Sequence, residues 1–169
     1  MRRFFPYIVA GAATLAVTTP LYSGPDQVAF PTGYQAAFVN YLDVDRLDRK
    51  RVRKMYVNPE ALAAAKAGED LPDGTILIME DHDAVLDGEM MKTDMDGRLI
   101  PMEAVGNIFV MEKNASWSTD NGNWDYAWYL ADGTPRPEAN FEGCFACHNN
   151  RADRDYNFTF SNYVTDQAR

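Results

Sequence analysis

The chain has 169 residues, of which 46% are hydrophobic and 24% charged, a composition typical of an ordinary globular domain and not of a disordered or fibrous protein. With 16 Lys and Arg residues against 25 Asp and Glu residues, its formal net charge is -9. Because an acidic surface repels a phosphate backbone, we exclude nucleic acid as the main partner.

The N-terminus has the pattern of an export signal. Arg2 and Arg3 precede an uncharged segment, residues 4–23, whose first two thirds are strongly apolar. The segment has no clear cleavage site and is almost long enough to cross a bilayer, so two interpretations stay open. Residues 1–24 are either a cleaved signal peptide or an N-terminal membrane anchor. Both predict a periplasmic protein, soluble after cleavage or tethered to the inner membrane by residues 4–23.

Residues 25–169 predict a single domain, because they contain no internal repeat and no linker long enough to divide them. Loss of residues 1–24 would remove two arginines and no acidic residue, so the formal net charge would move from -9 to -11. A surface this acidic favours encounter with a basic protein, such as a redox partner.

The first half of this domain alternates short strands with one helix. We expect a short helical turn running into a strand over residues 36–44, and a strand over residues 52–57. Residues 58–60, Asn-Pro-Glu, are a typical helix start, with Asn as N-cap and Pro at the first helical position. We expect this helix to end at Gly68. Residues 75–80 (TILIME) are rich in β-branched side chains and predict a strand.

The second half of the domain predicts further strands joined by turns. Residues 81–98 are polar and acidic and predict a hairpin arm or loop, and residues 107–113 predict a strand. Asn121-Gly122 predicts a tight turn before the aromatic strand over residues 124–130. Four to five strands with short helices indicate an α+β fold, mainly β, built on an antiparallel sheet. The long helices of a four-helix bundle are absent from the pattern.

Cys144, Cys147 and His148 form the motif C-x-x-C-H, which is typical of covalent haem attachment. In such sites two thiols add to the porphyrin vinyl groups and the His binds iron, which predicts one haem c per chain with His148 as the metal ligand. Three other interpretations of the motif are less well supported. A thioredoxin-like dithiol does not need the His, and a zinc site needs a fourth ligand, for which only His82 or a carboxylate remains. A disulfide would close a very short, strained loop.

The sixth iron position has several candidates. No Met follows His148, so a sixth ligand must come from upstream, and an open distal site is at least as well supported as a filled one. His82 follows a predicted strand, and a solvated loop histidine is favoured over a haem ligand. Glu138 is a candidate distal and catalytic carboxylate, although acidic side chains are mostly exposed, which favours a solvated loop acid.

Four aromatic side chains are candidates for the apolar wall of a haem pocket. They are Phe38, Phe109, Trp128 and Phe141. An ordinary core would use the same residue types.

The order and spacing of several short motifs resemble the cytochrome P-460 superfamily. The matching motifs are FPTGY at residues 30–34, RKMYVNP at 53–59, LPDGT at 71–75, GNW at 122–124, C-x-x-C-H at 144–148 and DYNFT at 155–159. This superfamily includes lysine-crosslinked cytochromes that oxidise hydroxylamine and uncrosslinked, gas-binding cytochromes c-prime-beta. The resemblance implies an antiparallel sheet with one haem packed against it, and a homodimer.

One departure from the crosslinked members indicates the branch. Those members bond a lysine, in the strand after the Asp-Gly-Thr turn, to the porphyrin edge, and in this chain Met79 stands at that position. A thioether supplies no amine nucleophile, and Lys92 and Lys113 lie at the wrong distance from the turn. The resemblance therefore implies the uncrosslinked cytochrome c-prime-beta branch, with Met79 near the haem edge. Hydroxylamine oxidation is expected only if a lysyl crosslink exists after all.

Three other residues belong to motifs that the family shares. Arg53 is a candidate partner of a haem propionate or of a sheet carboxylate, and we favour the haem. For Asp155 and Thr159 a structural role, folding the C-terminal segment over the haem, is the simpler interpretation.

Three functions stay open. The first is a haem protein whose open distal site binds small ligands such as nitric oxide or carbon monoxide. The second is an oxidoreductase that turns over peroxide or nitrogen oxides, which requires a distal acid or base. The third, ranked last, is a periplasmic electron carrier in which a Met or His fills the sixth site.

Overall fold

The structure is a computed structural model that describes residues 24–117 and 119–169. The predicted signal peptide or anchor of residues 1–24 therefore lies almost entirely outside the described residues. None of the described helices is long and apolar enough to span a membrane.

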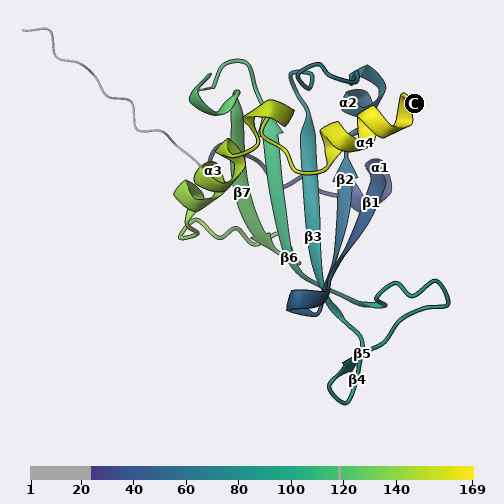
Figure 1. Ribbon diagram of the computed structural model, residues 1–169. Helices are drawn as coiled ribbons and strands as arrows, with labels where there is room; N and C mark the ends of the chain where they lie inside the picture. The colour runs from purple at the N-terminus through teal and green to yellow at the C-terminus, as the bar shows by residue number, and fades with distance from the viewer. Residues whose placement is uncertain (1–23, 118) are drawn as a thin grey trace, which may run out of the picture.

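Five antiparallel strands form one sheet in the order β1-β2-β3-β6-β7 (Figure 1). Their bounds are β1 Val39–Arg46, β2 Arg51–Val57, β3 Ile76–Ala84, β6 Pro101–Lys113 and β7 Trp124–Leu130. Neighbours in the sheet follow one another along the chain, apart from a protruding arm with the short hairpin β4 Leu86–Asp87 and β5 Met90–Met91. The predicted mainly β, α+β class is confirmed.

The helices are short. The α-helices are α1 Tyr34–Ala37, α2 Pro59–Ala64, α3 Phe141–Asn149 and α4 Phe160–Gln167. Three 3-10 turns complete the described elements: η1 Leu47–Arg49, η2 Thr119–Asn121 and η3 Ala152–Arg154. Helices α3 and α4 lie where no particular element was predicted.

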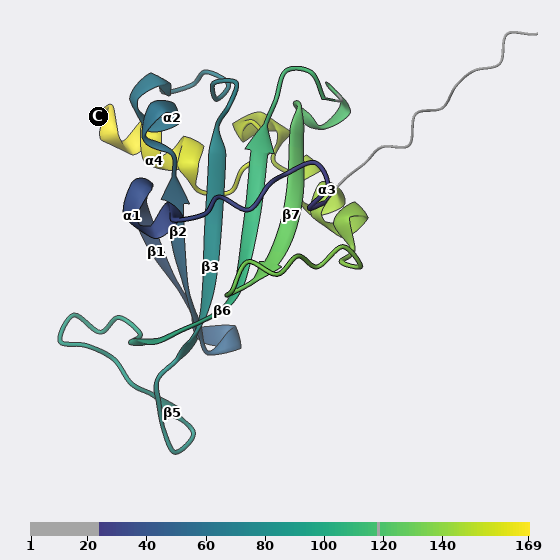
Figure 2. The same ribbon diagram turned by 180° about the vertical axis from the view of Figure 1, so that it is seen from behind.

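The sheet separates two layers of side chains. The C-terminal segment with α3 and α4 crosses one face (Figure 1), and the N-terminal segment of the described chain crosses the other (Figure 2). On the first face Trp124 and Phe160 are fully buried in one apolar cluster. On the second face Val28 and Ile78 are buried in another. Because side chains alternate along a strand, each strand contributes to both layers.

The helix prediction after β2 is only partly correct. Helix α2 ends at Ala64, before the predicted end at Gly68, and the Asn58 side chain does not cap it. Instead, Asn58 Oδ1 accepts a hydrogen bond from the Ile76 amide at 2.8 Å, and its Nδ2 donates to the Gly74 carbonyl at 3.2 Å. The side chain joins the ends of β2 and β3, a tertiary contact that replaces the expected local cap.

The end of the third strand was also predicted wrongly. Strand β3 continues beyond Glu80 to Ala84, so His82 is not a solvated loop residue; its side chain is 4% exposed. Ion pairs make this continuation possible, because buried charges require partners. Asp81 pairs with arginines of β2 on one face, and His82 pairs with Glu80 on the other.

Candidate functional site

Helix α3 places the three residues of the C-x-x-C-H motif together. Cys144, Cys147 and His148 occupy positions i, i+3 and i+4, which share one face of a helix, and all three line one cavity. The helix begins at this point because Asn140 caps it, with its Oδ1 accepting from the Gly143 amide at 3.0 Å. Both thiols are free.

The imidazole of His148 is held in one orientation. Its Nδ1 lies 2.6 Å from the carbonyl oxygen of Tyr156. A carbonyl only accepts, so Nδ1 carries the proton and the lone pair of Nε2 stays free. The ring packs against Tyr126 and Phe158, with centroids at 4.8 and 5.0 Å. Burial lowers the pKa of His148, which favours the neutral imidazole that binds a metal ion.

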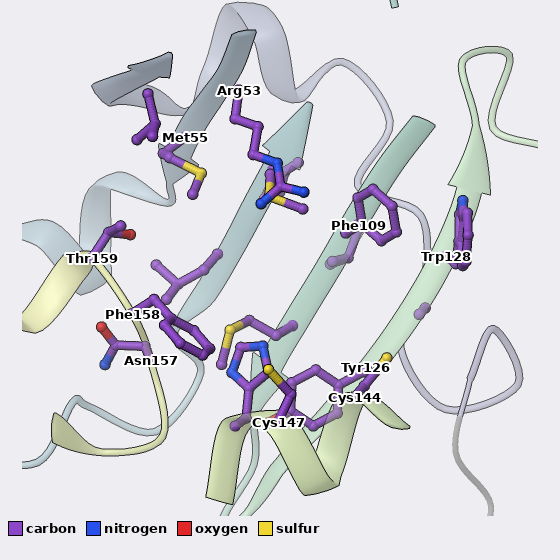
Figure 3. Close-up of a pocket in the computed structure, with 18 of the residues that line it drawn as sticks. Arg53, Met55, Phe109, Tyr126, Trp128, Cys144, Cys147, Asn157, Phe158 and Thr159 are labelled. Atoms are coloured by element: carbon purple, nitrogen blue, oxygen red, sulfur yellow. The ribbon is translucent and has the colours of Figure 1, made fainter. Parts of the chain in front are cut away.

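The cavity lies between the sheet and the C-terminal segment and has a volume of about 460 Å³. One register row of the sheet forms its floor: Met55, Met79, Phe109 and Trp128 are successive neighbours across β2, β3, β6 and β7. Met55, Phe109 and Trp128 are labelled in Figure 3. Phe158 and Thr159 of the C-terminal segment line it as well. A mostly apolar cavity of this size is typical of a cofactor site.

Arginines line the cavity where β1 ends and β2 begins. Arg53 points into it in Figure 3, and Arg46 of β1 also lines it. The Nε of Arg53 lies 3.3 Å from Asp81 Oδ1, while Arg51 Nη1 holds Asp81 Oδ2 at 2.6 Å. Arg51 also pairs with Asp83, at 3.2 Å, whereas the contact of Arg53 with Asp81 uses only its Nε, so the other N–H groups of Arg53 can bind an acidic group of a cofactor. The sheet carboxylate considered for Arg53 is therefore Asp81, and the side chain also reaches the cavity.

Two residues singled out from the sequence lie elsewhere. Glu138, the candidate distal carboxylate, is not among the cavity residues; its side chain is 65% exposed and pairs with Arg136 at 2.9 Å. Phe38 packs against the apolar cluster on the opposite face of the sheet. Phe109, Trp128 and Phe141 line the cavity as predicted.

His82 also lies away from the motif. It belongs to the residues of β3 that face away from the cavity, where it pairs with Glu80. It cannot complete a zinc site with Cys144, Cys147 and His148, because the sheet stands between them.

Tyr126, a wall residue of the cavity, was not predicted from the sequence. Its hydroxyl is buried without a hydrogen-bond partner among the described residues. Burial, and then the nearby Cys144, raise the pKa of Tyr126, so the hydroxyl stays a proton donor. An orphaned buried donor beside two thiols (Figure 3) indicates a site built for a further group. A strand position in an aromatic run carries no sequence signal for this role.

The C-terminal segment closes the cavity through polar anchors, of which only Thr159 was singled out from the sequence. Asn157, 1% exposed, donates through Nδ2 to the Arg154 carbonyl and to Ser161 Oγ, both at 2.7 Å. The hydroxyl groups of Thr159 and Tyr41 are 2.8 Å apart, which ties the segment to β1. This arrangement agrees with the structural role expected for Thr159.

The motif, the apolar cavity and the covered sheet together have the features of a haem-binding cytochrome. The family profile described as Cytochrome P460 matches residues 31–159, most of the described chain. The chain therefore belongs to the cytochrome P460 family and is a haem cytochrome. No curated protein matches it.

Proposed function

We propose that this protein is an exported monohaem c-type cytochrome whose open distal site binds small neutral ligands such as nitric oxide. Cys144 and Cys147 would hold the haem by adding their S–H groups across its two vinyl bonds, and His148 would be the proximal ligand. The bound haem would supply an iron centre with affinity for diatomic gases. The observation that carries the proposal is the free Nε2 of the partly buried His148, held towards an apolar cavity by the Tyr156 carbonyl.

The cavity residues fit such a group. The floor row with Met55, Met79 and Phe109 offers a flat apolar surface to a porphyrin plane. Arg53 would pair with a propionate in addition to Asp81. The unpartnered hydroxyl of Tyr126 is a further donor.

The residue types around the cavity support gas binding more strongly than acid–base catalysis. Among the described lining residues there is no Asp or Glu and no His besides His148. The guanidinium groups of Arg46 and Arg53 stay protonated and make poor proton shuttles. Turnover of peroxide requires a group that accepts and returns a proton above the iron, so an oxidoreductase activity ranks second.

A periplasmic electron carrier ranks third, and one observation favours it. The side chains of Met55 and Met79 both line the cavity, and a thioether is a common sixth ligand in electron-transfer haems. The acidic net charge would then serve to attract a basic redox partner. For each of these functions, we propose that the protein forms a homodimer and lies in the periplasm, soluble or tethered to the inner membrane.

Absorption spectra of the purified holoprotein separate these functions. We expect a five-coordinate, high-spin spectrum after dithionite reduction, and a shift of that spectrum when nitric oxide or carbon monoxide is added. A low-spin reduced spectrum that is indifferent to carbon monoxide would instead establish a filled sixth site and the electron carrier.

The branch of the family can be tested at Met79. We expect the wild type to lack a porphyrin crosslink, and Met79→Lys to form one when hydrogen peroxide is added. Peroxide is needed because replacing one N–H and one porphyrin C–H bond by a C–N bond releases two protons and two electrons. Mass spectrometry of haem peptides should then join the β3 peptide to that of residues 144–148. Met55→Lys, on the adjacent strand, is the matched control.

Two results would oppose this assignment. A crosslink in the wild type would place the protein among the hydroxylamine-oxidising members. Equal crosslinking in Met55→Lys and Met79→Lys would show that Met79 has no special position at the porphyrin edge.

A further inference from the structure

The hydrogen bond that orients His148 depends on an unusual turn. Its acceptor is the carbonyl of Tyr156, and both Asp155 and Tyr156 have positive φ angles, 49° and 60°. Left-handed backbone is unfavourable for residues with a side chain, and two in succession persist only where the surroundings hold them. The groups that hold this turn therefore also determine where the acceptor for His148 lies.

The carboxylate of Asp155 is the main anchor of the turn. It is 5% exposed and accepts from Lys113 Nζ at 2.9 and 2.8 Å, through its two oxygens. It also accepts from the Leu71 amide at 2.8 Å and from Trp124 Nε1 at 3.3 Å. These donors come from the end of β6, the segment before β3 and the start of β7, so one side chain joins the turn to three parts of the molecule.

Lys113 is placed to compensate the buried charge of Asp155. It ends β6, is 9% exposed, and lies over the ring of Trp124 with its Nζ 5.7 Å from the centroid. Its ammonium group is the only cation among the four contacts of Asp155 described above, so it compensates the buried charge. The geometry also explains why this lysine is not a crosslinking candidate: its Nζ is held by Asp155.

A second contact holds the residue that carries the acceptor. The ring of Tyr156 lies over Gly122, where an added Cβ would come within 2.5 Å of a ring carbon. Gly122 itself has a φ of 68°, a left-handed conformation that glycine adopts easily. A glycine at this position therefore permits both the backbone turn and the close packing of the Tyr156 ring. The ring packing and the Asp155 anchor together leave the carbonyl of Tyr156 little freedom.

We propose that Lys113 and Asp155 are positioning residues for the imidazole of His148. Their buried ion pair holds the turn at residues 155–156, and the turn presents the Tyr156 carbonyl to Nδ1 of His148. A hydrogen bond at this nitrogen orients the ring and raises the basicity of the other nitrogen towards a metal. The inference rests on the proposed function, because it takes Nε2 of His148 as the iron ligand.

Loss of the ammonium group has a defined consequence at His148. In Lys113→Met the carboxylate of Asp155 would be buried without a compensating charge, a strongly unfavourable state that moving towards solvent relieves. The turn would relax and the hydrogen bond to His148 would lengthen. The imidazole would then become a weaker donor to iron, which destabilises the ferric state and raises the reduction potential.

The test compares holoprotein variants by reduction potential and by the iron–histidine stretching band in resonance Raman spectra of the reduced protein. We expect Lys113→Met to shift the band to lower frequency and the potential upwards, and Lys113→Arg, which keeps the charge, to restore both in part. Lys92→Met, at an exposed lysine of the arm, is the matched control and should change neither.

Unchanged band and potential in Lys113→Met, with only a lower thermal midpoint, would overturn the inference and leave the pair a structural role. If Lys113→Met does not fold, Asp155→Asn decides the same question, because its amide oxygen still accepts from Leu71 or Trp124. A wild type without an iron–histidine band or a gas response, but with Lys113→Met still shifting the potential, would refute the open site while supporting the positioning role. A wild type without haem would refute the proposed function itself.

Discussion

Replacing both Cys144 and Cys147 by alanine is expected to abolish covalent haem retention. Each thiol would form one thioether, and both lie on the cavity side of α3. After expression in a host that matures c-type cytochromes, haem staining of a denaturing gel should detect the wild type and not the double variant. Each single variant should retain haem through one bond, with the band of its pyridine haemochrome displaced.

The two histidines provide the control for this experiment. His148→Ala should keep its haem on a denaturing gel, because both thioethers remain, but should lose the wild-type spectrum in the native state. A variant of His82, on the opposite face of the sheet, should keep both properties. Haem that stays on the gel in the double cysteine variant would refute attachment through this motif.

Replacing His82 by alanine is expected to lower the free energy of unfolding by about 3–5 kcal/mol, as is usual when one partner of a buried ion pair is removed. His82 Nε2 lies 2.9 Å from Glu80 Oε2, and its Nδ1 lies 2.9 Å from the Met102 carbonyl. Both partners accept, so the ring carries two protons and a positive charge. Without it, the Glu80 carboxylate would stay buried with only neutral donors.

Those donors are Tyr34, Gln35 and Tyr56, which surround Glu80 on the face opposite the cavity. Two further charged groups act on this cluster. The ammonium of Lys54 lowers the pKa of His82, opposite to the effect of Glu80, and the carboxylate of Asp43 raises the pKa of Tyr56. The double variant His82→Leu/Glu80→Leu should be less destabilised than either single variant, because it leaves no unpaired charge.

The pair also predicts how stability depends on pH. The hydrogen bond to Glu80 raises the pKa of His82 above 6.5. The contribution of the charged His82 to the free energy of unfolding is therefore complete below pH 6.5 and is lost as the pH rises through the raised pKa. Burial opposes ionisation of Glu80, but hydrogen bonds from His82, Tyr34 and Gln35 lower its pKa to about 2. The contribution of the ionised Glu80 to the free energy of unfolding is complete above about pH 4.5 and is lost as the pH falls towards 2.

Denaturant unfolding of wild type and His82→Ala across this range checks the prediction. The difference in unfolding free energy should be largest between about pH 4.5 and 6.5 and should shrink on both sides. Asp83→Asn, at the exposed neighbour of His82, is the control and should show no such pH dependence. A difference that is constant with pH would contradict a charged His82.

Much of the fold follows from local patterns. Strands β2 and β7 were predicted at or within one residue of their observed bounds, because alternation and aromatic or β-branched content are properties of short segments. The C-x-x-C-H motif is equally local: its three side chains share a helix face, so their proximity does not depend on the rest of the chain.

The predictions that failed depend on distant partners. The strand β3 was expected to end at Glu80, because a run of charged residues indicates a solvated loop, but Arg51 and Arg53 from another strand compensate Asp81 and permit burial. Asn58 was expected to cap a helix, and it instead joins two strand ends. Ion pairs and side-chain amides of this kind have no signature in a short window of sequence.

The sequence by itself determined the C-x-x-C-H motif, the mainly β class and the presence of Met79 in place of a lysine, since each depends on residue type and spacing along a few neighbouring positions. Only the tertiary structure decided which face of the sheet each side chain occupies. It placed Met79 in the cavity and both Glu138 and His82 outside it, and it brought the Tyr156 carbonyl to His148. The physical reason is that sheet pairing and a buried charge network, formed by residues far apart in the chain, set these positions.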